Sequence, residues 1–138
     1  MTSPGQRFPF LVRSTNAGMP FTAPVLPIQL SLTKTTTVNG LLDTGATVNV
    51  LPHSVGLILG ADWNAQTVPI QLAGNLASIQ AKALLVTATL ATFPPVKLAF
   101  AWANSDAVPL LLGQINFFAE FDVCFFRHRG EFEVRPKS

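Results

Sequence analysis

Residues 41–46 read Leu41-Leu42-Asp43-Thr44-Gly45-Ala46, so a single carboxylate follows two leucines and precedes a turn of small residues. Asp62 is the only other acidic or basic side chain between Lys34 and Lys82, histidine aside. Burying a carboxylate costs free energy unless it is hydrogen-bonded, paired or able to hold a proton. The position of Asp43 therefore indicates either an Asx-turn, in which its side chain binds nearby backbone, or a chemical role.

Alternation of apolar and polar residues predicts β-strands on both sides of this turn. Leu26, Ile28, Leu30 and Leu32 share one face of a strand over residues 25–32. After a polar turn at 34–36, residues 37–42 return as the second strand of a hairpin that ends at Asp43, and residues 47–51 form a third strand. Eleven prolines, nine glycines and many short β-branched runs favour an all-β domain.

The remaining elements are expected to be short. We expect residues 1–23 to be irregular apart from an edge strand over 8–12, and residues 24–138 to form one domain. A short helix is expected over 52–59, with Pro52 as its first residue and Gly60 as the stop that follows it. Asn116 is expected to cap a second helix, over 117–121. The expected further strands cover 68–72 and 79–90, which flank a hairpin tip at 73–75, then 96–102, 108–112 and a terminal hairpin over 123–134.

Composition limits the classes of protein that fit. The chain has 138 residues, of which 49% are hydrophobic and only 12% charged, which is typical of one small domain that associates or binds a ligand. Polar residues and prolines interrupt the longest apolar run, at 83–96, so no integral membrane segment is expected. The N-terminus is a poor match to a signal peptide and Cys124 is the only cysteine, which favours a cytoplasmic protein with Cys124 as a small buried residue.

Several other kinds of site are not supported. The net charge is +2, and the basic residues of the last twelve positions alternate with Glu131 and Glu133, so nucleic-acid binding is not expected. His53, His128 and Cys124 have no metal-ligand spacing, so no metal and no cofactor are expected. Ser54 lacks the context of a catalytic serine. Trp63 and Trp102 are expected to pack in the core or in a dimer interface.

A second apolar run that ends in glycine follows Asp43 by about seventy residues. It reads Leu110-Leu111-Leu112-Gly113 and is followed by Gln114-Ile115-Asn116-Phe117-Phe118. With the hairpin and the Asp43 turn, this run resembles the retropepsins, the single-domain aspartic proteases of the retroviral type and their cellular and bacterial relatives. The resemblance covers roughly residues 25–135. It implies an all-β, closed retropepsin-like barrel with one or two short helices, acting as a C2 homodimer.

The resemblance also implies an activity and a set of site residues. The chain would be an aspartic endopeptidase whose water is activated by two Asp43 carboxylates, one from each copy, acting on a peptide or protein substrate. Thr44, Gly45 and Ala46 would form the active-site loop, and Thr44 would reach across to the partner. Substrate-binding residues would be Thr47, Val48, Leu111 and Gly74, the last at the tip of a flap.

Two departures from the family pattern leave an alternative open. Retroviral members often carry an acid after the alanine of the loop and an arginine after the second glycine, where this chain has Thr47 and Gln114. The expected flap has one glycine and no aromatic residue. A catalytically weak retropepsin-fold module for dimerisation or peptide binding is therefore the second hypothesis. A third is a proteolytic domain cut from a longer precursor.

Overall fold

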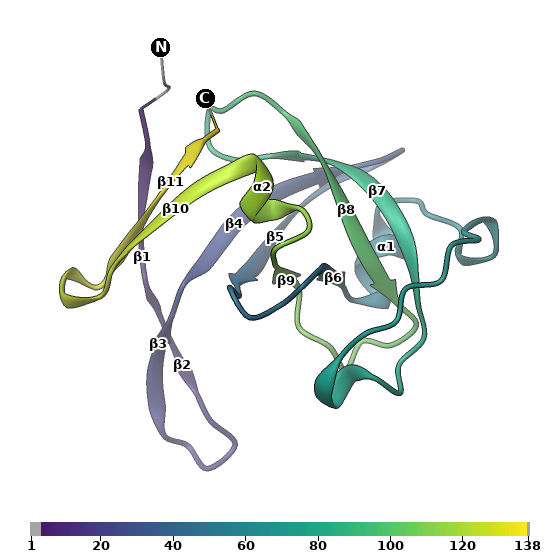
Figure 1. The fold of residues 1–138 in the computed structure, drawn as a ribbon, viewed down its shortest axis with the longest axis horizontal. Helices are drawn as coiled ribbons and strands as arrows, with labels where there is room; N and C mark the ends of the chain where they lie inside the picture. Colours follow the sequence, from purple (N-terminus) through teal and green to yellow (C-terminus); the bar gives the residue numbers. More distant parts are fainter. Residues whose placement is uncertain (1–3, 138) are drawn as a thin grey trace.

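A computed structural model describes residues 4–137, and its centre is a closed barrel of six strands in the order β4-β5-β9-β6-β8-β7 (Figure 1). The barrel strands are β4 (Val25–Ser31), β5 (Thr35–Leu42), β6 (Asn49–Leu51), β7 (Ala81–Thr89), β8 (Val96–Ala103) and β9 (Leu111–Leu112). The predicted all-β class is confirmed. The strands expected over 47–51 and 108–112 are shorter than predicted.

The β4–β5 hairpin forms as the alternating pattern predicts. Its antiparallel register runs from Val25 opposite Leu41 to Ser31 opposite Thr35. Leu26, Ile28 and Leu30 face the barrel interior and are at most 1% exposed. Leu32 does not join them, because the strand ends at Ser31 and its side chain lies in the exposed turn.

Strand β9 brings the second apolar run, Leu110 to Gly113, beside the strand that precedes Asp43. It pairs in parallel with β5, with Leu41 opposite Leu111 and Leu42 opposite Leu112, and it pairs with β6 on its other side. Parallel neighbours end at the same edge of a sheet. The turn after β5 and the residues after β9 therefore lie at the same edge of the barrel.

Two smaller sheets lie outside the barrel. One is three-stranded, in the order β1-β11-β10, and the other is the β2–β3 hairpin. Their strands are β1 (Gln6–Pro9), β2 (Leu11–Ser14), β3 (Pro20–Ala23), β10 (Phe121–Phe126) and β11 (Glu131–Pro136). The predicted terminal hairpin is confirmed, but Cys124 is exposed rather than buried, because it lies opposite Glu133 on the outer face.

The expectation of a mostly irregular segment over residues 1–23 is wrong for the described part, which begins at residue 4, and the edge strand expected over 8–12 is divided at Phe10 between β1 and β2. Strand β1 pairs with β11 along four residues, and Phe8 stacks on Phe132 with ring centroids 5.5 Å apart. The partner of this strand lies at the opposite end of the chain, so the local sequence carries no signal of it. Residues 1–3 lie outside the described residues.

Helical turns fill the connections: α1 (His53–Ile58), α2 (Phe117–Glu120), η1 (Trp63–Ala65), η2 (Gly74–Leu76) and η3 (Arg127–Arg129). Helix α1 begins after Pro52, and Gly60 follows it with φ of +88°, as predicted. Gly56 lies inside this helix because a Cβ there would collide with the indole of Trp102. Trp102 is fully buried, and His53 stacks on it with ring centroids 5.3 Å apart.

The strand predicted over residues 68–72 is wrong. Only Pro69 bridges to Lys82, and the expected hairpin tip folds into the 3-10 turn η2 instead. Two backbone hydrogen bonds flank this bridge, from Ala83 N to Val68 O at 2.8 Å and from Ile70 N to Ala81 O at 2.9 Å, and pairing with β7 ends there. The Gln71 Nε2 then closes a compact loop by donating to the carbonyl oxygens of Leu72 at 2.9 Å and Ala77 at 3.0 Å.

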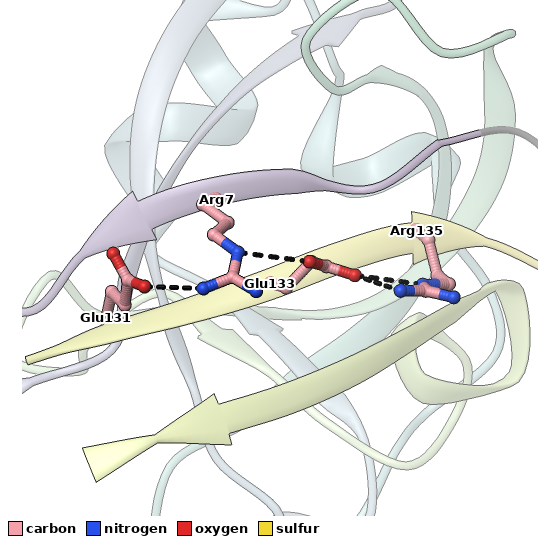
Figure 2. A network of polar contacts seen from close by, with 4 residues as sticks. All are labelled: Arg7, Glu131, Glu133 and Arg135. Carbon is pink, nitrogen blue, oxygen red and sulfur yellow. Dashed lines mark hydrogen bonds and ion pairs between the residues drawn. The ribbon is translucent and has the colours of Figure 1, made fainter. Parts of the chain in front are cut away.

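A line of charges fastens β1 to β11 (Figure 2). Arg7 Nη1 lies 2.6 Å from Glu131, and Arg7 Nε lies 3.2 Å from Glu133, which also pairs with Arg135. The hydrogen bond from Arg135, with the charges of Arg135 and Arg7, holds the pKa of Glu133 below its ordinary value of 4.5, although desolvation opposes the shift. Folding therefore favours the ionised form of Glu133.

Replacing this carboxylate should reveal a pH-dependent contribution to stability. The wild type should melt at a higher temperature than Glu133→Gln at neutral pH. Because the folded-state pKa is the lower one, this advantage is complete above the unfolded-state pKa near 4.5 and is lost as pH falls through the folded value. Thermal melts of both proteins between pH 3 and 7 measure it. A difference in melting temperature that stays constant down to pH 3 would contradict the assignment.

Candidate active site

Asp43 lies in the tight turn that follows β5. Its backbone N–H donates to Leu112 O at 3.0 Å, and its carbonyl accepts from Ala46 N at 3.1 Å. The side-chain Oδ1 accepts from Gly45 N at 3.0 Å, so the expected Asx-turn bond is present. No other hydrogen bond or ion pair reaches this carboxylate within residues 4–137. The other carboxylate oxygen makes no hydrogen bond to the described residues.

The residues after β9 hold this turn in place. Gln114 Nε2 donates to Thr44 O at 2.8 Å, and the backbone N–H of Gln114 donates to Ala46 O at 2.9 Å. Ile115 N adds a bond to Thr47 O at 2.9 Å. The uncharged amide of Gln114 thus connects the two motifs by a hydrogen bond.

Gly113 is required by how closely the two segments approach. A Cβ at this position would lie 2.6 Å from Ala46 O and 2.7 Å from Val48 O, shorter than any ordinary contact. Both contacts are to backbone, which cannot rotate away as a side chain can. The glycine of the second motif therefore allows the loop after β9 to lie directly against the Asp43 turn.

Asn49 is a residue whose role the sequence did not reveal. It is 0% exposed and is the one buried polar side chain of the core among the described residues. Its Oδ1 accepts from Gly113 N at 2.8 Å, and its Nδ2 donates to Ala99 O at 3.0 Å. The only signal in the sequence was a polar residue between Val48 and Val50 in an apolar run. Asn49 thereby links β6, β8 and the loop that holds Asp43.

Asn116 extends this polar network and does not cap helix α2 as predicted. Its side chain makes no capping hydrogen bond. Its Oδ1 instead accepts from Ala99 N at 2.9 Å, and its Nδ2 donates to Lys97 O at 3.0 Å. The amide therefore takes the place of a strand partner along β8, which fixes the segment between β9 and α2 against the barrel.

A cleft of about 280 Å³ opens beside Asp43. It brings together residues of the Asp43 turn, of strand β6, of the η2 segment and of strand β9, namely Asp43, Gly45, Ala46, Thr47, Val48, Val50, Leu72, Ala73, Gly74, Asn75, Leu76 and Leu111. Of the eight residues expected at the site, only Thr44 is absent from this lining. Thr44 is exposed and its carbonyl accepts from Gln114.

The walls of this cleft are mostly apolar. Val50, Leu72 and Leu111 belong to a second, smaller core cluster that lies beneath it. Asp43 is the only charged side chain in the lining, so no cation faces the carboxylate there. The arrangement suits an extended apolar chain lying across a single acid.

The other aspartates of the described chain have roles elsewhere. Asp62 Oδ1 accepts from Asn64 N at 3.1 Å at the start of η1. Asp106 Oδ1 accepts from Ser54 N at 2.7 Å, and this bond lowers the pKa of Asp106. Asp122 is exposed on β10, opposite Arg135. Asp43 is therefore the one aspartate of the described residues that lines the cleft.

Comparison with solved structures relates this barrel to one known architecture. The chain superimposes on the crystal structure of a retropepsin-like aspartic protease from Rickettsia conorii with a TM-score of 0.58, over 96% of this chain and 94% of that chain. The fold is retropepsin-like. The sequence identity is 13%, so this likeness concerns the fold alone. Neither a protein-family model nor a curated protein matches the sequence.

The retropepsin-like barrel accounts for the meeting of the two motifs, because parallel pairing of β5 with β9 brings Asp43 beside Leu112 and Gly113. No group of three or more His, Cys, Asp or Glu side chains within residues 4–137 is placed to hold a metal ion. None of the helices in this part of the chain has the length and apolarity needed to cross a bilayer.

Proposed function

We propose that the protein is an aspartic endopeptidase that works as a homodimer, with one Asp43 from each copy at a shared active site. The observation that carries this proposal is the lone carboxylate in a cleft without any other charge. One of its oxygens is bonded to Gly45 N and the other is available to a second chain. The retropepsin-like fold supports the same arrangement.

Two carboxylates within hydrogen-bond distance share one proton, because two adjacent negative charges cannot both persist in a water-poor site. The ionised Asp43 would act as general base on a water that attacks the peptide carbonyl. The protonated Asp43 of the partner would polarise that carbonyl, and a proton would then pass to the leaving nitrogen. Thr44, exposed beside Asp43, is available to hydrogen-bond across the two-fold axis.

The substrate would lie in the apolar cleft as an extended chain. Val48 and Leu111 line the cleft close to the Asp43 turn, and Leu76 and Gly74 lie on the η2 segment. An extended peptide satisfies its backbone by pairing with exposed protein backbone. The η2 segment would cover the peptide as the flap.

One observation favours the second candidate, a module that binds peptides or dimerises without efficient cleavage. The η2 segment forms a 3-10 turn, not an extended hairpin, so fewer backbone groups are free to pair with a peptide there. If the η2 segment closed poorly over the peptide, water would remain in the site. Electrostatic catalysis is stronger where water is excluded. Such a module would bind apolar peptides without turnover.

Incubation with a diverse peptide pool from pH 3 to 8, with and without a statine-type transition-state mimic, separates the two candidates. The endopeptidase should cleave with an optimum at about pH 4–6, as expected of a carboxylate pair that shares a proton. The mimic should block cleavage. At low protein concentration the specific activity should fall, because monomers lack the second acid. Binding without cleavage at every pH would favour the module.

A further inference from the structure

The β2–β3 hairpin projects from the barrel at its lower left in Figure 1 and pairs with no other strand of residues 4–137. All of its strand residues except Ala23 are exposed. Its large apolar side chains are Leu11, Val12, Met19 and Phe21, with exposed fractions of 39%, 71%, 64% and 46%. A two-stranded hairpin is only marginally stable alone in water, and a cluster of exposed apolar residues marks a contact surface.

This hairpin is nevertheless firmly held at its root. Phe10 N donates to Gly130 O at 2.8 Å, and the Phe10 ring packs against Phe132 with centroids 5.8 Å apart. Arg127 lies over the same Phe10 ring and donates to Thr22 Oγ1 at 2.9 Å. Ala23 is buried, and β4 begins two residues later at Val25, which is buried too. The hairpin is therefore a fixed arm, so docking onto it costs little ordering entropy.

A groove of about 400 Å³ separates this arm from the barrel. Arg13 and Phe21 lie directly opposite each other in the hairpin register, so they share one face, and both line the groove. Leu41 and Leu110 line it on the barrel side and are joined by a hydrogen bond from Leu41 N to Leu110 O at 2.9 Å. Leu41 precedes Asp43 by two positions on the same strand end. The groove and the cleft share no lining residue, but Leu110 of the groove directly precedes Leu111 of the cleft.

We propose that this groove holds part of a second copy of the chain, so that each copy's β2–β3 hairpin embraces the other in the dimer that shares the two Asp43 residues. The inference rests on the proposed function. Two Asp43 carboxylates can share a proton only if the partner lies against the edge of the barrel where β5 and β9 end, and the groove opens at that edge. The shared proton therefore requires a second copy of the chain beside the groove, and it requires no other molecule there.

The size of a stable interface supports the same occupant. A specific interface buries about 800 Å² on each partner, which a turn of a few residues around Asp43 does not supply. The exposed apolar residues of the hairpin add the missing surface next to that turn. A two-fold axis makes the contact occur twice, once for each arm.

The dimer dissociation constant tests this proposal, measured by sedimentation equilibrium for Phe21→Thr, for Leu11→Thr and for the wild type. Each hairpin variant should raise the constant about tenfold or more, as expected for truncation of a buried apolar contact. Leu85→Thr is the matched control, because Leu85 is an apolar strand residue, 57% exposed, on β7 of the barrel. It should leave the constant unchanged. Circular dichroism establishes whether each variant is folded. If Phe21→Thr does not fold, the dissociation constant of Leu11→Thr alone decides the test.

The same series in the Asp43→Asn background keeps the hairpin contact separate from the activity. If the hairpin substitutions raise the dissociation constant equally in that background, the result would support contact between the hairpin and the second copy, whether or not the wild type cleaves peptides. An inactive wild type would overturn only the proposed function. Unchanged dissociation constants in both hairpin variants would overturn the proposed hairpin contact and would not affect the proposed function. A raised KM at an unchanged dissociation constant would place a peptide in the groove and also overturn it. A wild type that stays monomeric at every concentration would overturn both.

Discussion

Asp43→Asn should abolish peptide cleavage and leave the fold and the dimer unchanged. Asparagine has nearly the shape of aspartate and retains an oxygen that can accept from Gly45 N, now bonded at 3.0 Å. It cannot take a proton from water, and in the dimer both acids are lost together. General acid–base catalysis by such groups contributes about 10²- to 10⁴-fold, so we expect a loss of at least about 10³-fold in kcat. Wild-type turnover in the purified variant would refute the assignment.

Asp122→Asn is the matched control for this result. Asp122 is exposed on β10 and lies outside the lining of the cleft, so the same chemical change should leave kcat within about twofold. The control also excludes a general effect of removing one negative charge from the chain.

Mixing the two proteins tests whether each site needs both acids. At concentrations where the chains are dimeric, a fourfold excess of the Asp43→Asn protein should reduce wild-type activity to about one fifth, because random pairing leaves that share of wild-type chains with a wild-type partner. An activity that does not change on mixing would mean that each copy acts alone.

Asn49→Leu should cause the largest loss of stability. It leaves the N–H of Gly113 and the carbonyl of Ala99 without their hydrogen bonds, which are 2.8 and 3.0 Å long in the native protein. A buried polar group that loses its partner costs about 1–3 kcal/mol. We expect a loss of about 2–4 kcal/mol in the free energy of unfolding and a fall in Tm on the order of 10 °C. Denaturant unfolding and thermal melts measure both.

Asn64→Leu is the control for this change, because Asn64 is exposed and its side chain makes no hydrogen bond within the described chain. Its effect should stay within about 0.5 kcal/mol. Since Gly113 adjoins Leu112, whose carbonyl binds Asp43 N, Asn49→Leu should also reduce cleavage in the protein that remains folded. Equal stability of the two leucine variants would show that Asn49 is not a structural link.

Local patterns predicted the elements whose partners lie close by in the chain. The period of two in residues 25–32 predicted the first strand of the β4–β5 hairpin, and its pairing partner follows after a short turn. Pro52 and Gly60 marked the ends of α1 because each suits one end of a helix. The small residues after Asp43 predicted a tight turn, which forms with the expected Asx-type bond.

Patterns failed where a distant segment changes the outcome. Strand β1 is ordered by β11, and residues 68–72 pair with the distant strand β7 only around Pro69, which is opposite Lys82. Cys124 alternates with apolar neighbours, but its register with β11 puts it on the exposed face. In each case the sequence contained the residue but not the identity of its neighbour.

The order of residues was enough to single out Asp43 and to predict an all-β domain around it, because turn chemistry and strand alternation act over a few neighbouring residues. The closed barrel was expected only from the resemblance of two motifs to those of the retropepsins. The roles of Asn49 and Asn116 and the groove beside the β2–β3 hairpin came from three-dimensional packing. They depend on which strands lie side by side and in what register, and those pairings join residues that are far apart along the chain.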